Sequence, residues 1–231
     1  MIDESNAKTR FVVTGLGRCG SNLLKFALKQ NRGIYMVGEY FNRNVYPEAF
    51  SEDGAHRAET FFANAPGQCA GFKLFEHQGR KDPALSVWDY LTSHPGIKVI
   101  HLKRRNYFER VLSLQVASAR GQWLADNQGT DDIVVNMGPS KWERLLRQDA
   151  KKEQRLDRMF RDNDGYSLTY EDLVADWEGQ TRAIQAFLGV EPAKLEQKLK
   201  KQETKHPSER CPNYQALKKH FAGTEFDWMF S

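Results

Sequence analysis

A glycine-rich turn between an apolar strand and a helix constrains this chain more than any other local feature. Residues 10–14 are mostly apolar and β-branched and predict a buried strand. Residues 15–20 then read G-x-G-x-x-G, and apolar residues from Leu23 onward recur at helical spacing. Because the first N–H groups of a helix lack backbone partners and its dipole favours negative charge, this arrangement predicts an anion-binding loop.

The rest of the chain alternates between strand and helix patterns. Further strands are expected over residues 34–37, 71–75, 98–102 and 167–170. Helices are expected after residue 106, over residues 141–162 and over residues 176–188. Such alternation predicts an α/β fold with a central, mainly parallel sheet of four or five strands and helices on both faces. We expect one domain over residues 1–231, with a helical extension from about residue 190.

Composition and charge exclude several classes of protein. Hydrophobic residues make up 40% of the 231, which is enough for a core, but the longest apolar run is four residues, so no membrane span is expected. The polar, acidic amino terminus lacks a signal-peptide pattern, and we expect a cytoplasmic protein. Basic runs at residues 103–105 and 198–201 are short and separate, so no nucleic-acid partner is expected. Three distant cysteines predict neither a disulfide framework nor a metal site.

Three chemistries use a strand, a glycine turn and a helix in this order. An NAD(P)-dependent oxidoreductase is one alternative, because Glu39 lies 19 residues beyond Gly20, where a ribose-binding acid is expected. An ATP or GTP site is rejected, since Ser21 and Asn22 stand where Lys and Ser or Thr are needed. A sulfuryl-donor site is the third chemistry, and more of the chain bears on it.

Several segments together resemble the PAPS-dependent sulfotransferases. Residues 18–23 are similar to the loop that holds the 5′-phosphosulfate of PAPS in that family; they are Arg18, Cys19, Gly20, Ser21, Asn22 and Leu23. Arg105 and Ser113, eight residues apart, look like the pair that grips the 3′-phosphate. The segment around Tyr170 resembles the one that packs a tyrosine near the adenine. Residues 38–41 and 71–75 look like the bacterial carbohydrate enzymes of the trehalose and nodulation-factor types.

The resemblance implies a P-loop-like three-layer fold and a specific reaction. A sulfuryl group would move in line from PAPS to an acceptor hydroxyl of a saccharide or another small molecule, releasing PAP without a metal. Glu39 would be the general base, with His77 as the second candidate, and Arg18 and Lys73 would stabilise charge on the donor. Residues 42–68 and 124–140 match nothing recognisable, and we expect the acceptor pocket there. A nucleotide-binding module without catalysis remains a further alternative.

Local chemistry adds expectations for individual residues. A phosphate is well matched by the planar fork of Arg105, and strand alternation places Lys103 on the same side as Arg105. Arg104 would then face away and take no part in binding. Ser21 and Asn22 are also candidates to cap the helix that follows the loop. Tyr170 is expected at a strand position, where core packing competes with adenine stacking as its role.

Overall fold

The computed structural model describes residues 8–81, 83–121, 133–198 and 206–230. The chain forms two compact units: residues 1–103 with 153–198 make unit 1, and residues 104–152 with 199–231 make unit 2. The expectation of one functional domain over residues 1–231 stays a prediction.

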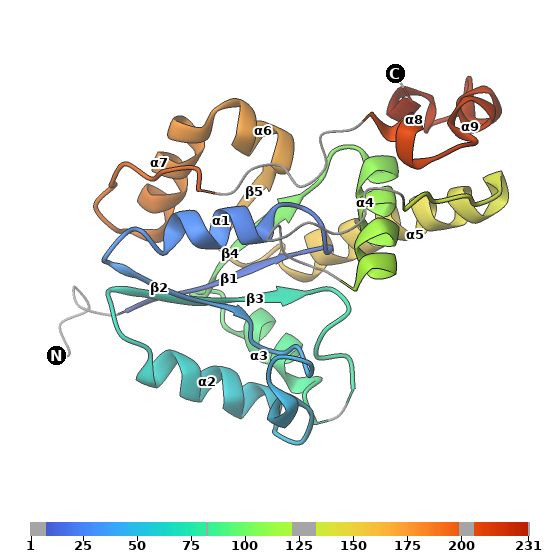
Figure 1. Ribbon diagram of the computed structural model, residues 1–231. Helices are drawn as coiled ribbons and strands as arrows, with labels where there is room; N and C mark the ends of the chain where they lie inside the picture. Colours follow the sequence, from blue (N-terminus) through green and yellow to red (C-terminus); the bar gives the residue numbers. More distant parts are fainter. Residues whose placement is uncertain (1–7, 82, 122–132, 199–205, 231) are drawn as a thin grey trace, which may run out of the picture. The chain divides into compact units, whose positions relative to one another are not determined.

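Unit 1 is built on a five-stranded parallel sheet (Figure 1). The strands are β1 (Thr9–Gly15), β2 (Ile34–Glu39), β3 (Cys69–Phe75), β4 (Lys98–Lys103) and β5 (Gly165–Thr169). Their order across the sheet is β2-β3-β1-β4-β5. Parallel strands end at the same edge of a sheet, so the ends of β1, β2 and β3 bring the glycine loop, Glu39 and the residues after Phe75 to one edge. The predicted α/β fold is confirmed.

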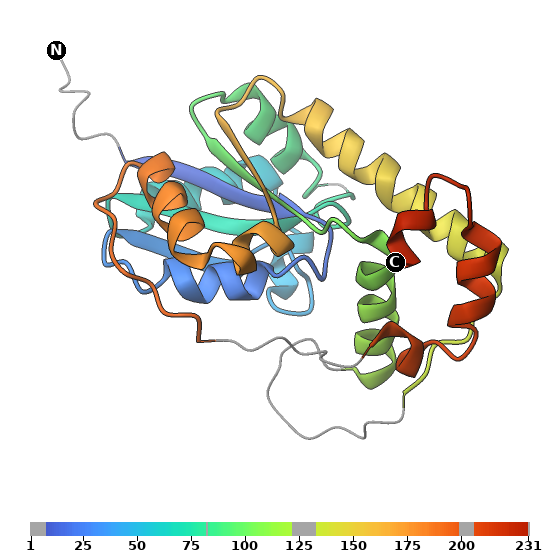
Figure 2. The same cartoon turned by 90° about the horizontal axis from the view of Figure 1, so that it is seen from above.

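Helices cover both faces of this sheet. Helices α1 (Ser21–Leu28), α6 (Tyr170–Ala175) and α7 (Trp177–Leu188) lie on one face, and α2 (Gly54–Asn64) and α3 (Ser86–Ser93) lie on the other (Figure 1). Seen from above, α1 and α7 run side by side (Figure 2). The sequence did not predict α2, α3 or α6, and α2 occupies part of the segment that resembled nothing.

Aromatic side chains fill the layer between the sheet and α2. The ring of Phe72 on β3 contacts Phe41, Phe61 and Phe62 at centroid distances of 5.3–5.5 Å. On the same strand, Gly71 leaves room for a neighbouring ring, because a Cβ there would lie 2.5 Å from ring atoms of Phe11. The core of unit 1 therefore depends on one small residue directly opposite a large one.

Unit 2 is helical and has its own core. It holds α4 (Tyr107–Arg120), α8 (Pro207–Arg210), α9 (Tyr214–Phe221), a 3₁₀ turn at Asp227–Phe230 and most of α5 (Pro139–Met159) (Figure 2). Phe108 lies at the centre of the buried rings, with centroids 4.5 Å from Trp142 and 4.6 Å from Phe230. Arg110 forms a buried ion pair with Asp149, which joins α4 to α5. In the region where a helical extension is expected from about residue 190, residues 191–198 form no helix, and α8 and α9 lie further along the chain.

Two strand boundaries differ from the sequence prediction. β5 ends at Thr169, whose side chain caps α6, so Tyr170 is the first residue of a helix and not a strand residue. β4 ends at Lys103, so strand alternation does not extend to Arg104 and Arg105. In both cases the strand ends at the edge of the sheet, and the residues that follow no longer alternate between its two faces.

The described part of the chain has two further properties. None of its helices is both long and apolar enough to cross a bilayer. Cys19, Cys69 and Cys211 are all buried and reduced. Burial raises the pKa of the Cys69 thiol to about 12 and that of Cys211 to about 11.

Gly71→Ala should lower the free energy of unfolding by about 1–3 kcal/mol, because the new methyl group would overlap the ring of Phe11. Urea unfolding followed by tryptophan fluorescence measures this change. Gly96→Ala is the matched control: nothing lies within 4 Å of a Cβ at that position, and the effect should stay below about 0.5 kcal/mol. Equal losses in both variants would contradict the packing argument.

Candidate active site

The glycine loop leads from β1 into α1 without any side-chain cap. Gly20 is the residue before the helix and has a positive φ of 83°, and Arg18 also has a positive φ of 71°. The sequence expectation that Ser21 or Asn22 caps α1 is wrong, because both belong to the helix and neither caps it. The N–H groups of the first turn are therefore available to an anion.

Lys73 is the buried charge that faces this helix start. It lies on β3 with only 1% of its surface exposed. Its Nζ is 2.7 Å from Asn22 Oδ1 and 3.3 Å from Ser21 Oγ, so the two residues that do not cap the helix are partners of the lysine instead. Lys73 on β3 therefore contacts the first turn of α1 through its charged end.

Burial lowers the pKa of Lys73 to about 8 from its ordinary 10.5. Two charged neighbours modify this shift: Glu39 favours the ammonium form, and Lys25 disfavours it. Because a pKa of about 8 is above neutrality, the side chain remains mostly an ammonium ion at pH 7. The site thus holds a positive charge that its surroundings compensate only in part.

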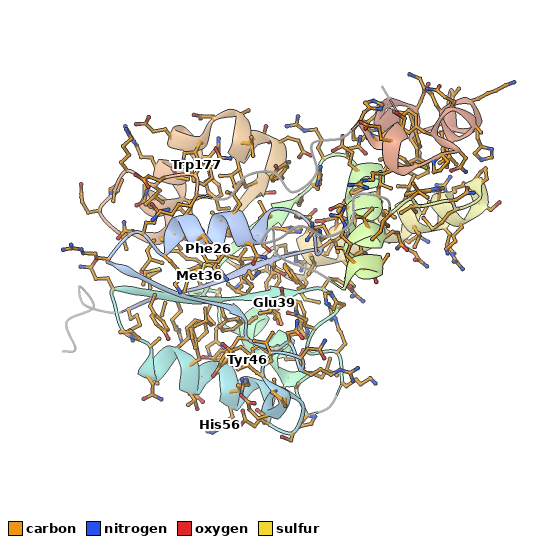
Figure 3. The ribbon with its side chains drawn as sticks, in the orientation of Figure 1. Phe26, Met36, Glu39, Tyr46, His56 and Trp177 are labelled. Carbon is orange, nitrogen blue, oxygen red and sulfur yellow. The ribbon has the colours of Figure 1, made fainter. Side chains whose placement is uncertain are left out.

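Glu39 is the last residue of β2, and Figure 3 marks it at that end of the strand. The register between β2 and β3 shifts after Met36, which brings Glu39 opposite Lys73. Its Oε1 lies 3.6 Å from Lys73 Nζ. Its Oε2 accepts hydrogen bonds from Asn42 Nδ2 and Gln78 Nε2, each at 2.7 Å.

Tyr170 and Cys19 flank the loop in different ways. A Cβ at Gly20 would lie 2.5 Å from Cδ2 of the Tyr170 ring, so the ring rests directly on the glycine. Only glycine fits that position, both for its φ and for this contact. Cys19, the residue before this glycine, is fully buried.

The second candidate base has a different environment. His77 is exposed and stacks on the ring of Phe75, with ring centroids 6.0 Å apart. Glu39, by contrast, is half-buried and within 3.6 Å of the buried lysine. This contact with the charged centre of the site makes Glu39 the first candidate.

Arg105 and Ser113 belong to unit 2. Arg105 is exposed and precedes Asn106, whose side chain caps α4, and Ser113 is half-buried on that helix. Arg104 forms a 2.6 Å ion pair with Glu109. Because β4 ends at Lys103, strand alternation gives no reason to separate Arg104 from Arg105.

The sequence did not predict two polar residues of the site. Asn42 and Gln78 hold Glu39, yet each follows a strand in a loop without a recognisable motif. The available signal was the Glu39-x-x-Asn42 spacing, which is typical of a tight turn with a side-chain contact. Among the described residues, no group of three or more His, Cys, Asp or Glu side chains could hold a metal ion.

The order of the strands bears on the oxidoreductase alternative. In dinucleotide-binding folds the order is 3-2-1-4-5-6, so the second strand lies beside the first and its acid reaches the ribose. Here β3 pairs with both β1 and β2 and separates them. Glu39 therefore faces Lys73 on the intervening strand, which disfavours a ribose-binding role.

Comparison with known proteins identifies the class. A model of the Sulfotransferase family matches residues 81–194. The crystal structure of a sulfotransferase from Alicyclobacillus acidocaldarius shares the fold, with a TM-score of 0.53 and 18% identity over 94% of this chain and 92% of that one. The resemblance drawn from the sequence is confirmed, and the chain is a transferase of the sulfotransferase class.

Two curated relatives match along almost their whole length. Nodulation protein H of Rhizobium tropici is 25% identical over 244 residues, covering 100% of this chain and 96% of the relative. Nodulation protein H of Rhizobium meliloti (strain 1021) is 24% identical over 234 residues, covering 95% and 94%. The similarity therefore extends through both units and includes the glycine loop, β2 and β3.

The lowered pKa of Lys73 predicts a pH-dependent stability. Between pH 8 and 10.5 the unfolded chain binds more protons at this residue than the folded chain, so the free energy of unfolding should rise with pH. Relative to Lys73→Met, the wild-type free energy of unfolding should therefore increase by up to about 3 kcal/mol between pH 8 and 10.5. Urea unfolding at several pH values measures it, and a difference independent of pH would contradict the lowered pKa.

Proposed function

We propose that this sulfotransferase moves a sulfuryl group from PAPS to an acceptor hydroxyl and releases PAP. The observation that carries the proposal is the contact set of Lys73, which joins the uncapped start of α1 to the carboxylate of Glu39. An anion placed at the helix start would meet both the N–H groups and a buried ammonium ion. A carboxylate at the same place is suited to remove a proton from an acceptor.

The donor would be held by residues of the loop. The N–H groups after Gly20 and the Arg18 side chain would bind the 5′-phosphosulfate, in the stretch Arg18, Cys19, Gly20, Ser21, Asn22 and Leu23. Arg105 and Ser113 would bind the 3′-phosphate, and Tyr170 would lie near the adenine. PAPS supplies the sulfuryl group and the leaving phosphate. No metal is needed, because positioning and fixed positive charge carry such a transfer.

In the transfer step, Glu39 accepts the proton of the acceptor hydroxyl while the oxygen forms a bond to sulfur. The bond from sulfur to the phosphate oxygen breaks in line, and its electron pair leaves with PAP. Lys73 and Arg18 stabilise the negative charge that develops on this leaving group. The acceptor is a saccharide or another small alcohol, as the resemblance of residues 38–41 and 71–75 to the bacterial carbohydrate enzymes implies.

Nucleotide binding is the first test. PAP should raise the melting temperature of the protein, while NAD and ATP with magnesium should do much less at equal concentration. Binding to the folded state alone adds about 2.7 kcal/mol at a hundredfold excess over Kd. Differential scanning fluorimetry measures the shift. Stabilisation by NAD and none by PAP would overturn the proposal.

Arg105→Ala should weaken PAP binding by about 2–4 kcal/mol, because it removes a charged, two-pronged donor from a phosphate. Arg104→Ala is the matched control. Its side chain is already engaged by Glu109, so PAP affinity should change little. Titration calorimetry compares the two variants, and equal losses would remove Arg105 from the 3′-phosphate site.

Glu39→Gln tests the base. The amide keeps the size of the side chain but loses proton affinity, so turnover should fall by about 10²–10⁴. PAP affinity should stay close to that of the wild type, whereas ribose binding by Glu39 would make nucleotide affinity fall. Sulfation assays and calorimetry on one variant separate these outcomes. Near-normal turnover would remove Glu39 from the mechanism and make His77 the next candidate.

A further inference from the structure

The two carboxylate oxygens of Glu39 have different surroundings. Oε2 accepts two hydrogen bonds, from Asn42 Nδ2 and from Gln78 Nε2, both at 2.7 Å. Oε1 lies 3.6 Å from Lys73 Nζ, which is longer than an ordinary hydrogen bond. One oxygen is therefore held by neutral donors, and the other faces the charged end of the site.

The two amides are oriented so that only their NH₂ groups can face Glu39. Gln78 Oε1 accepts the backbone N–H of Phe75 at 3.1 Å, and Asn42 Oδ1 accepts the N–H of Asn44 at 3.0 Å. Turning either amide over would place an NH₂ group against a backbone N–H and an oxygen against a carboxylate. Both groups would then lose their partners, which fixes each amide as a donor to Glu39.

Gln78 is also held firmly by its backbone. Only 5% of its surface is exposed. Its N–H donates to Phe75 O at 2.9 Å, and its carbonyl accepts Trp88 Nε1 at 3.0 Å. Asn42 sits in a tight turn, in which its own N–H donates to Glu39 O at 3.0 Å. Neither donor has to be ordered when an acceptor binds.

Resting on the proposed function, we propose that Gln78 and Asn42 are positioning residues that fix the general base. They hold Oε2 in place and leave Oε1 as the oxygen that accepts the acceptor's proton. Both donors complement the negative charge of the carboxylate, which is the form that acts as a base. Because rigid neighbours already hold the carboxylate in its reactive orientation, no free energy is needed to order it during the reaction.

The test is Gln78→Met, which keeps the length of the side chain and removes the donor. Turnover at neutral pH should fall roughly tenfold, and the acidic limb of the pH profile of kcat should move up by about one pH unit. The charged groups that act on Glu39, Lys73 on β3 and Lys25 on α1, are unchanged in this variant. An unchanged pH profile would overturn the proposal.

Gln185→Met is the matched control for loss of a buried glutamine. Gln185 on α7 is fully buried. Its side-chain amide forms hydrogen bonds with the side chain of Asn31 and with the backbone of Ala193. This variant should lose stability and yet keep the wild-type pH profile. If it moved the profile as Gln78→Met does, the effect would come from a loosened fold, and the proposal would fail.

Asn42→Ala is a second test. The Asn42 side chain is half-buried, so the fold depends less on it than on the buried side chain of Gln78. It should move the acidic limb in the same direction by a smaller amount. In a Glu39→Gln background, Gln78→Met and Asn42→Ala should each have little further effect on turnover, because residues that act through one base are not additive. Full additive losses would contradict a positioning role.

These outcomes separate this proposal from the function on which it rests. Glu39→Gln with near-normal turnover would refute the base itself. An inactive Glu39→Gln together with an unshifted pH profile in Gln78→Met and Asn42→Ala would refute only the positioning role. PAP stabilisation, measured in every variant, should remain that of the wild type, since neither amide belongs to the nucleotide site.

Discussion

Placing the Lys73 ammonium inside unit 1 is the constraint on which the candidate site depends. Taking such a charge out of water costs several kcal/mol, and here one amide oxygen, one hydroxyl and one carboxylate at 3.6 Å offset that cost only in part. These partners come from α1 and β2, so the lysine joins three elements at one sheet edge. An incoming phosphate or sulfate would complete the compensation, as the proposed donor site requires.

The parallel sheet explains why the site can be so compact. Because β3 lies between β1 and β2, the residue at the end of β2 and the start of α1 are both within reach of one β3 side chain. The turn after β3 adds Gln78 from the same edge. Binding groups thus come from consecutive strand ends, which is where open α/β sheets hold their ligands. The same chain segments in another strand order would not meet.

Much of this arrangement could be predicted from the sequence. Every expected strand is present, because strands of a parallel sheet leave short β-branched and apolar runs bounded by turns, as β1 and β4 do. The sequence predicted Tyr170 at a strand position, but it is the first residue of α6. The apolar pattern of the strand outweighed the capping signal at Thr169. The capping role of Ser21 and Asn22 was wrong, because the lysine that engages them is 52 and 51 residues away in sequence. Gln78 was missed for the same reason: its partner Glu39 lies on another strand.

The buried cysteines give the two units separate internal reporters. A thiol reacts as the thiolate, and burial keeps both Cys69 in unit 1 and Cys211 in unit 2 protonated at neutral pH. Modification by a thiol reagent therefore requires that the surrounding structure open first. The rate at each cysteine measures how often its own unit opens, so one labelling experiment resolves two local free energies that a single melting curve would merge.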